Sequence, residues 1–285
     1  MQFDAALYFP QWQGGPNAGH VAVGGHYLYE QLRKTLKLEG FAVDFSQTHQ
    51  PEHGIWHYPA ITANLAQARQ WLAACAPRTL FTLGGDCSID VASISHLHGV
   101  HGAHFGVIWI DAHADINTPA SSPSQFFHGM PLRALLGEAP AGICQHIAHP
   151  LSPRQICYAG TRSIDGPEQD YISALKLPAL TSAQVNRRDY NVCEAWLAQS
   201  GIRALHIHFD LDALDPSAGI TTTYQIEGGI EAQAMADFLG WLHGRGITVG
   251  FSLTEYAPKA ENAQEIGRIL SLLQSILPLR DAQAA

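Results

Sequence analysis

Two short stretches of this chain carry acidic and imidazole side chains at alternating positions, directly after apolar runs. The first, Asp111-Ala112-His113-Ala114-Asp115, follows the run 105–110, whose β-branched and aromatic residues are typical of a buried strand. Alternate side chains of an extended backbone share one face, so two carboxylates and an imidazole can converge there. Ionisable groups placed straight after a buried strand are costly to desolvate without a cation. The stretch therefore predicts a metal site.

The second stretch repeats this arrangement. A strand-like run over 202–209 ends in Asp210-Leu211-Asp212-Ala213-Leu214-Asp215-Pro216. Together the two stretches hold more oxygen ligands than one structural zinc needs, since zinc prefers four ligands rich in Cys and His. They suit two divalent ions, roughly 3.5–4 Å apart and bridged by shared carboxylates. Aspartate is also common in ordinary strand-end turns, but two turns with matched spacing favour the metal interpretation.

Composition sets the broad class of the protein. A chain of 285 residues with 46% apolar content can bury a substantial core, and we see no linker or repeat, so we expect one domain over 1–285. The net charge of −9 argues against nucleic-acid and anionic-membrane partners. The N-terminus lacks a signal-peptide pattern, and no apolar run is long enough to span a membrane. Five scattered cysteines fit a reducing compartment, so we expect a cytoplasmic protein.

Strands and helices are predicted to alternate along the chain. Such alternation is typical of a mostly parallel, about eight-stranded sheet covered on both faces, an α/β fold. The carboxyl ends of parallel strands meet at one edge, where ligand sites of open α/β sheets gather. The polar motifs all follow the third, fourth, seventh and eighth strands, which supports one shared site. The predicted strands are 2–9, 41–45, 79–83, 105–110, 155–159, 178–180, 202–209 and 247–253, and the first and last helices are 24–39 and 263–277.

With two further motifs, these stretches resemble the ureohydrolase (arginase/agmatinase) family. The added motifs are Gly84-Gly85-Asp86-Cys87-Ser88 and His128-Gly129-Met130-Pro131, and the match runs in order from Gly84 to Pro258. The resemblance implies a three-layer α/β/α domain with two Mn²⁺ ions per chain. It also implies hydrolysis of a guanidino group by a metal-bridging hydroxide, and a homo-oligomer, a trimer or hexamer.

The resemblance assigns roles to individual residues. Two ions would lower the pKa of a bridging water, so that hydroxide exists near neutral pH. Asp115 would also orient this nucleophile, Glu255 would pair with the substrate guanidinium, and His128 would help to protonate the departing amine. The implied metal ligands are Asp111 and Asp210 as bridges, Asp115 with Cys87 for one ion, and His113 with Asp212 for the other.

Substrate recognition is implied for the loop after Asp115 and for the segment 160–168. These resemble arginases, in which Asn117, Ser122 and Ser124 would contact the α-carboxylate. Asp165 and Glu168 would hold the α-amino group, and an anionic pair beside hydroxyl and amide donors suits a zwitterion. The alternative for these two acids is a stabilising cluster at a helix N-terminus.

Four positions depart from the family pattern. Cys87 stands where most members have a ligand histidine; its thiolate would shift metal preference toward Zn²⁺ or Fe²⁺, unless it is a buried bystander. A cysteine here resembles an Nω-hydroxy-L-arginine amidinohydrolase branch. Phe126 and Phe127 replace a polar and an aliphatic residue, which removes a donor for the substrate. His208 replaces a small hydroxyl residue, and it either contacts a bridging carboxylate or is a buried structural histidine.

The leading interpretation is a hydrolase that converts L-arginine or Nω-hydroxy-L-arginine to ornithine plus urea or hydroxyurea. The alternative within the enzyme class is an agmatinase, guanidinobutyrase or formimidoylglutamase. A catalytically silent metal-binding homologue is the alternative from another class. A zinc deacetylase of related fold is disfavoured, because its single zinc ion needs fewer ligands than this chain offers.

Overall fold

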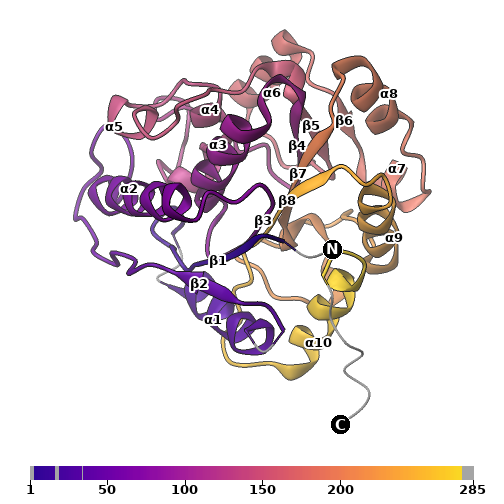
Figure 1. The fold of residues 1–285 in the computed structure, drawn as a ribbon, viewed down its shortest axis with the longest axis horizontal. Helices are drawn as coiled ribbons and strands as arrows, with labels where there is room; N and C mark the ends of the chain where they lie inside the picture. Colours follow the sequence, from indigo (N-terminus) through magenta and orange to yellow (C-terminus); the bar gives the residue numbers. More distant parts are fainter. Residues whose placement is uncertain (1–2, 17–18, 34, 278–285) are drawn as a thin grey trace.

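A computed structural model describes residues 3–16, 19–33 and 35–277, in which eight strands form one sheet (Figure 1). Neighbouring strands all pair in parallel, and their order is β2-β1-β3-β8-β7-β4-β5-β6. The predicted parallel α/β fold is confirmed; residue 2 of the predicted first strand lies outside the described residues. The strands are β1 (Ala5–Phe9), β2 (Leu38–Gly40), β3 (Leu80–Gly84), β4 (Phe105–Ile110), β5 (Ile156–Ala159), β6 (Ala179–Leu180), β7 (Ala204–Asp210) and β8 (Thr248–Thr254).

Helices cover both faces of the sheet and complete the three layers (Figure 1). A parallel sheet with apolar residues on both faces requires this double cover. On one face lie α2 (Tyr58–Cys75), α3 (Asp90–His101), α4 (Pro131–Leu135), α5 (Ala141–Cys144) and α6 (Gly166–Leu175). On the other face lie α1 (His20–Leu32), α7 (Ser182–Asn186), α8 (Asn191–Ser200), α9 (Ala232–His243) and α10 (Ala263–Leu272).

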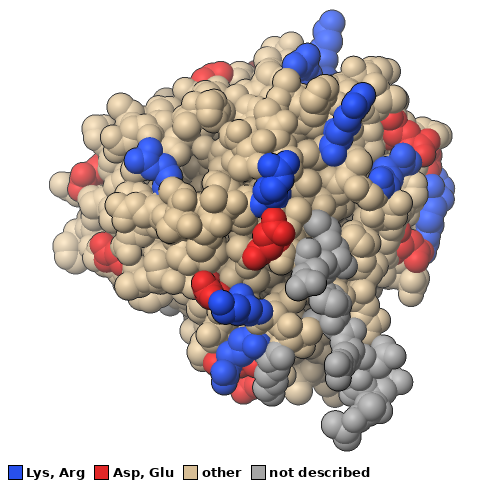
Figure 2. All heavy atoms as spheres, in the orientation of Figure 1, with Lys and Arg blue, Asp and Glu red and all other residues tan. Residues whose placement is uncertain are grey.

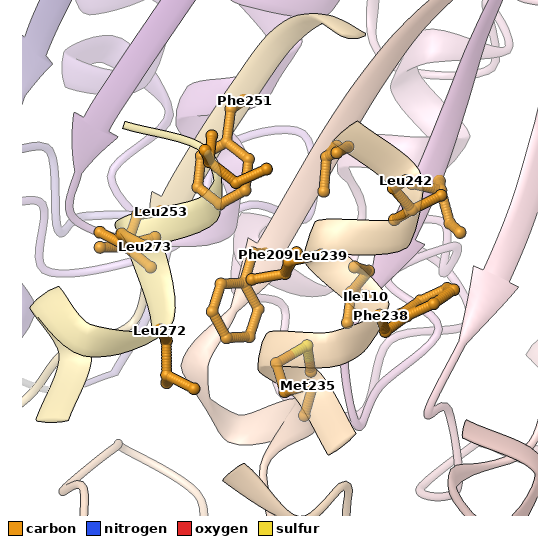
Figure 3. Packing of buried hydrophobic residues seen from close by; sticks show 14 of the residues in the cluster. Ile110, Phe209, Met235, Phe238, Leu239, Leu242, Phe251, Leu253, Leu272 and Leu273 are labelled. Carbon is orange, nitrogen blue, oxygen red and sulfur yellow. The ribbon is translucent and has the colours of Figure 1, made fainter. Parts of the chain in front are cut away.

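Alternate residues of the central strands divide between these two layers. Phe209 of β7 and Phe251 of β8 pack with Phe238 of α9 in the core shared with α9 and α10 (Figure 3). Because successive strand residues point to opposite faces, the neighbours of Phe209 along β7, His208 and Asp210, face the layer of α2 and α3. The candidate ligands of β7 therefore emerge on the same side of the sheet as Trp109 of β4, which belongs to that second core.

The strand order brings the separate sequence motifs together. β3, β8, β7 and β4 are consecutive across the middle of the sheet. The motifs that begin at Gly84, Asp111, Asp210 and Glu255 each lie at the carboxyl end of one of these strands. Because the strands are parallel, all four carboxyl ends lie at the same edge. The sheet thus supplies the convergence that the spacing of the motifs predicts.

The predicted elements at the start of the chain are wrong in their bounds. The helix expected over 24–39 ends at Leu32, and the strand expected over 41–45 is instead β2 (Leu38–Gly40). Leu36 and Leu38 continue the helical spacing, but Leu38 pairs with Ala6 of β1 as an edge strand. Sheet pairing thus overrides the apolar period here. The short helices α4, α5 and α7 are not predicted, because four or five residues hold too little of a helical repeat.

The exterior carries a mixture of charges. Lys and Arg side chains lie among Asp and Glu on the face displayed in Figure 2, rather than in a patch of one sign. No helix in the described part of the chain is both long and apolar enough to cross a membrane. The absence of nucleic-acid and membrane partners stays a prediction.

Candidate metal centre and active site

The turn after β3 presents Cys87. A Cβ atom at Gly85 would lie 1.6 Å from the carbonyl oxygen of Gln11, so glycine is required for this turn to pass the loop after β1. Asp86 then caps the short 3-10 helix Cys87–Ile89 by accepting the backbone N–H of Ser88 at 2.9 Å. Cys87 is only 2% exposed, and its thiol donates a hydrogen bond to Asp210 Oδ2 at 2.9 Å.

Backbone amides and an indole hold the carboxylates that follow β4 and β7. Asp111 Oδ2 accepts Trp109 Nε1–H at 3.0 Å, and its Oδ1 accepts the N–H of His113 at 2.7 Å. Asp210 Oδ1 accepts the N–H of Asp212 at 2.6 Å. The Ala112 N–H donates to Asp212 Oδ1 at 3.1 Å and so ties the two stretches together. These hydrogen bonds fix the carboxylates before any ion is bound.

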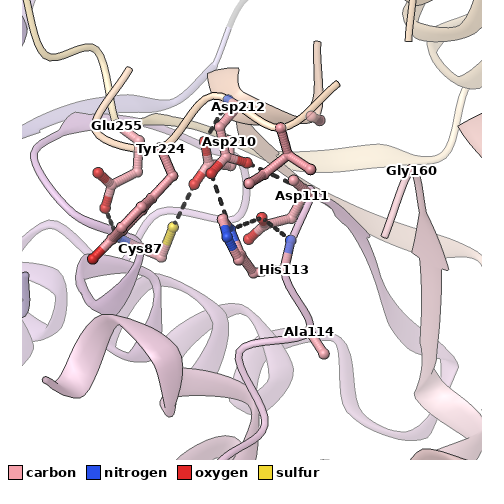
Figure 4. A network of polar contacts seen from close by, with 12 residues as sticks. Cys87, Asp111, His113, Ala114, Gly160, Asp210, Asp212, Tyr224 and Glu255 are labelled. Atoms are coloured by element: carbon pink, nitrogen blue, oxygen red, sulfur yellow. Dashed lines mark hydrogen bonds and ion pairs between the residues drawn. The ribbon is translucent and has the colours of Figure 1, made fainter. Parts of the chain in front are cut away.

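Ligand atoms gather in two groups that share Asp111 (Figure 4). We call Cys87, Asp111, His208 and Asp210 the inner group, because all four residues are buried. Asp111, His113 and Asp212 form the cavity-side group, in which the His113 side chain is 26% exposed. Within each group the ligand atoms lie within 4.8 Å of one another. Donors about 2.0–2.3 Å from one ion lie at most about 4.6 Å apart, so each group is close to the size of a single-ion site.

The charges of the site fit divalent cations. Burial, and then the charge of Asp212, raises the pKa of Asp210 well above its usual value. Burial, and then the charge of Asp86, does the same to the pKa of Glu255. Burial alone would lower the pKa of His113, but hydrogen bonds to Asp111 and Asp212 outweigh it and raise this pKa strongly. The cluster thus holds excess negative charge that cations would offset, and its oxygen, nitrogen and sulfur donors are those that divalent metals use.

Asp115 lies beside the two groups rather than within them. Its ligand atoms are not part of either group found among the described residues. Its backbone has a φ of 51°, in the left-handed region, and its side chain lines a cavity. Asp115 Oδ2 is buried and makes no hydrogen bond within the described part of the chain. Burial, and then the charge of Asp111, raises the pKa of this carboxyl. Its predicted role as a ligand for the same ion as Cys87 stays a prediction.

Asp215, the third acid of the second stretch, has a structural position. Its Oδ1 accepts the N–H of Ser217 at 3.0 Å, and its Oδ2 accepts the N–H of Gly228 at 3.1 Å. It thereby caps the 3-10 helix Pro216–Ala218. This is the ordinary turn role of aspartate, and it sets Asp215 apart from Asp210 and Asp212.

A cavity of about 290 Å³ opens onto the cavity-side group. His113 and His128 both line it. His128 Nδ1 lies 3.8 Å from Glu255 Oε1, and that oxygen accepts the N–H of Cys87 at 3.3 Å. Burial lowers the pKa of His128 to about 4. Glu255, like Asp115, has a positive φ, 64°, a strained backbone that is common at functional sites.

All five predicted substrate-binding residues line the same cavity, and they contact one another there. Asn117 Nδ2 donates to Asp165 Oδ2 at 2.9 Å, and the hydroxyls of Ser122 and Ser124 are 3.3 Å apart. Glu168 Oε1 accepts the N–H of Ile116 at 3.0 Å, while its Oε2 accepts the N–H of Asp165 at 3.0 Å. The two acids thus form a capping box of α6, as the structural alternative predicts. The lining set is Asn117, Ser122, Ser124, Asp165 and Glu168.

The two phenylalanines before His128 are not among the residues that line this cavity. Phe127 is fully buried in the core beneath α2 and α3. Phe126 stacks on Trp56, with ring centroids 6.1 Å apart. Phe126 also meets the ring of His128 edge-on, with centroids 6.4 Å apart, so these residues can affect the substrate only through His128 and its loop.

Two residues at the site are missed by sequence reasoning. Tyr224 lines the cavity and stacks on His128 with ring centroids 5.9 Å apart. It also meets the ring of His113 edge-on at 5.5 Å; Figure 4 labels both residues. A lone aromatic residue in a polar loop is its only signal. Arg162 donates to the carbonyls of Asp212, Ala213 and Ile226 at 3.0, 3.2 and 2.7 Å. It thereby joins the loop after β7 to the segment that carries Tyr224.

Comparison with known proteins identifies the family. A sequence model of the arginase family matches residues 26–275. The arginase of Staphylococcus aureus (strain COL) is 30% identical over 265 residues, which cover 88% of this chain and 87% of the relative. The arginase of Coccidioides immitis (strain RS) is 32% identical over 292 residues, 93% of this chain and 89% of the relative.

Solved structures agree with this result. The Entamoeba histolytica arginase in complex with L-ornithine superposes with a TM-score of 0.85 and 27% identity, over 98% of this chain and 99% of that one. The formimidoylglutamase of Bacillus subtilis, at 16% identity and a TM-score of 0.72, shares the fold, with 96% and 88% covered. The chain therefore belongs to the arginase family and is a hydrolase acting on guanidino C–N bonds, with a buried cluster of Asp, His and Cys residues suited to divalent metal.

Proposed function

We propose that the protein hydrolyses the guanidino group of L-arginine or Nω-hydroxy-L-arginine, giving ornithine plus urea or hydroxyurea, with two Mn²⁺ ions. The observation that carries the proposal is one cavity lined by two kinds of residue. His113 joins it to the cavity-side group, and the other lining residues include the set of polar residues suited to an α-amino acid. Because the inner group contains the Cys87 thiol, a divalent ion other than Mn²⁺ would also suit that position.

When bound, the ions would activate a water molecule near neutral pH and polarise the guanidino group. The carboxylates of Asp111 and Asp210 are already fixed by N–H donors, so little reorganisation is needed to hold two cations. Asp115, whose Oδ2 has no hydrogen bond within the described chain, is free to accept a proton from that water and to orient it.

His128 and Glu255 serve the leaving group and the guanidinium. Since burial lowers the pKa of His128 to about 4, the imidazole is neutral near pH 7. It can therefore relay to the departing amine the proton that Asp115 accepts from the attacking water. Glu255, buried and 3.8 Å from His128, supplies a carboxylate for the guanidinium group.

The polar residues that line the cavity would select the amino-acid part of the substrate. Asp165 and Glu168 provide negative charge for an ammonium group, and each carboxylate oxygen can accept a second hydrogen bond besides its capping contact. Asn117, Ser122 and Ser124 provide amide and hydroxyl donors for a carboxylate. A substrate without the α-amino or α-carboxylate group would lose one of these contacts.

A substrate panel tests the proposal. Mn²⁺-loaded protein is assayed for release of urea, hydroxyurea or formamide from L-arginine, Nω-hydroxy-L-arginine, agmatine, guanidinobutyrate and formimidoylglutamate. We expect turnover only with the two α-amino acids that carry a guanidino group. Faster turnover of agmatine or guanidinobutyrate would replace the proposal by those activities. Tight metal binding without product from any substrate would instead support a silent, metal-binding homologue.

Between the two amino acids, we propose a preference for Nω-hydroxy-L-arginine. A thiolate ligand donates more charge than an imidazole, so it lowers the Lewis acidity of its ion. The more activated hydroxyguanidine depends less on that acidity. Equal or faster turnover of L-arginine in the same assay would defeat this preference.

We also propose a cytosolic homo-oligomer, a trimer or hexamer. All five cysteines are free, and Cys87, Cys157 and Cys193 are buried, which suits a reducing compartment. Sedimentation of the purified protein measures the assembly, and a single species of monomer mass would contradict it. Cell fractionation tests the location.

A further inference from the structure

His208 is held in a fixed orientation while one of its buried ring nitrogens has no hydrogen-bond partner within the described chain. A histidine with a purely structural role does not require this arrangement. His208 lies on β7, two residues before Asp210, and is completely buried. Its register neighbours are Trp109 of β4 and Ser252 of β8. The imidazole lies flat on the Trp109 indole, with ring centroids 3.5 Å apart and an interplanar angle of 10°. The plane of the ring is therefore fixed by packing.

One ring nitrogen of His208 is held by a buried carboxylate. Nδ1 lies 2.6 Å from Asp90 Oδ2, at the start of α3. Asp90 also accepts the Ser252 hydroxyl and lies 3.4 Å from Nε2 of His206. Because a carboxylate accepts, the proton of the neutral imidazole is on Nδ1, and the Nε2 lone pair is free. A carboxylate that orients a histidine in this way is a common feature behind metal-binding imidazoles.

The other ring nitrogen points into the inner group. His208 Nε2 makes no hydrogen bond within the described part of the chain, although it is buried. It lies 3.8 Å from Asp111 Oδ2, and within 4.8 Å of ligand atoms of Cys87 and Asp210. An unpartnered buried nitrogen is costly unless it has a partner in the working protein. A metal ion among these four donors would supply that partner.

We propose that His208 is a metal ligand, which binds through Nε2 the ion held by Cys87, Asp111 and Asp210. The four donors, one sulfur, one nitrogen and two carboxylates, suit a four-coordinate site. The inference deepens the proposed function, and it rests on that proposal only in assuming that the site binds divalent ions. It also implies that, of the two proposed Mn²⁺ ions, the inner one is more readily replaced by Zn²⁺ or Fe²⁺, while the cavity-side donors favour Mn²⁺.

Titration of the full-length, metal-free protein with Co²⁺ tests this inference. The thiolate-to-cobalt charge-transfer absorption reports the ion bound to Cys87, and elemental analysis after dialysis counts the ions per chain. In H208N the amide nitrogen retains the donor toward Asp90 and removes Nε2. We expect the affinity of the sulfur-bound ion to fall by at least about 10-fold. The cavity-side ion should remain bound.

His206→Asn is the matched control. His206 shares strand, burial and Asp90 with His208, but it is in neither ligand group of the described chain. We expect its charge-transfer absorption and metal count to equal those of the wild type. Equal Co²⁺ affinity of the sulfur-bound ion in H208N and wild type would overturn the inference. So would an equal loss of affinity in both variants, since that would assign the effect to the Asp90 network.

A measurement on unmutated protein covers the case in which H208N does not fold. Protein labelled with ¹⁵N-histidine is loaded with ¹¹³Cd²⁺, and the sulfur-bound resonance is identified by its shift. We expect this resonance to be split by one directly bonded ¹⁵N nucleus; an unsplit resonance would refute ligation by His208. If the split resonance is seen but no substrate is hydrolysed, the ligand set stands and the proposed function fails. If arginine is hydrolysed and the resonance is unsplit, the reverse holds.

Discussion

The inner group and the cavity-side group share Asp111 but differ in surroundings. The inner group is sealed between Trp109, Thr254 and the α3 layer and contains a thiol. The cavity-side group has only carboxylates and one partly exposed imidazole, and it opens to the substrate cavity. The comparison suggests a division of labour. The inner ion would contribute positive charge to the site while protein ligands fill its coordination positions. The cavity-side ion would keep coordination positions open for water and substrate.

Removing the shared ligand should have the largest effect. In D111N both groups lose a charged donor while side-chain size is kept. We expect turnover to fall by about 10⁴-fold or more, as when a group on which a whole catalytic unit depends is lost. Metal content should fall below one ion per chain. Asp215→Asn is the control, because Asp215 belongs to neither group and caps a turn. If D111N bound two ions as tightly as D215N, the shared role would be wrong.

His128→Asn should separate chemistry from metal binding. His128 lines the cavity but is in neither ligand group of the described residues. We expect a loss of turnover of about 10²–10³-fold, within the range for a lost proton carrier. Both ions should stay bound, as shown by elemental analysis. A decrease in metal content would show that His128 supports the cavity-side group instead.

Cys87→His should change the metal preference of the inner group alone. An imidazole is neutral and harder than a thiolate, so we expect Mn²⁺ affinity at this position, or turnover of arginine with Mn²⁺, to rise by about 10-fold. Isothermal titration and the urea assay measure these quantities. Cys157→Ala, at a buried thiol in the core shared with α9, is the control. No change in either quantity would mean that Cys87 is not a ligand.

The two groups also differ in how much the sequence can predict of them. Asp111, His113, Asp210 and Asp212 follow buried strands at a spacing of two, and the period of a strand is a property of the local sequence. The assignment of each residue to an ion, and the order of strands that brings the motifs side by side, depend on the sheet. Asp115 has the same spacing, yet a left-handed backbone turns it toward the cavity.

His208 and Tyr224 mark the limit of sequence reasoning. The environment of His208 depends on the register of β4, β7 and β8 and on Asp90, 118 positions away in the chain. Tyr224 reaches the cavity in a loop that Arg162 holds through backbone carbonyls, which have no sequence signature. Both positions are set by contacts between distant segments. The sequence can therefore single out His208 without deciding between its two alternatives, and it gives no role to Tyr224.

Substitution of Tyr224 should have the smallest effect of these changes. It tests whether the ring that covers His113 and His128 contributes to substrate binding. The Tyr224 ring stacks on His128 and meets His113 edge-on, and such aromatic contacts contribute about 0.5–1.5 kcal/mol. We therefore expect Tyr224→Ala to raise KM by about 2–10-fold, with a smaller change in kcat and both ions retained. Tyr224→Phe keeps the ring and should behave as the wild type. If instead the phenylalanine variant lost activity as much as the alanine variant, the hydroxyl rather than the ring would be the functional group. Tyr224 would then act on the substrate itself, because the contacts with His113 and His128 are made by the ring.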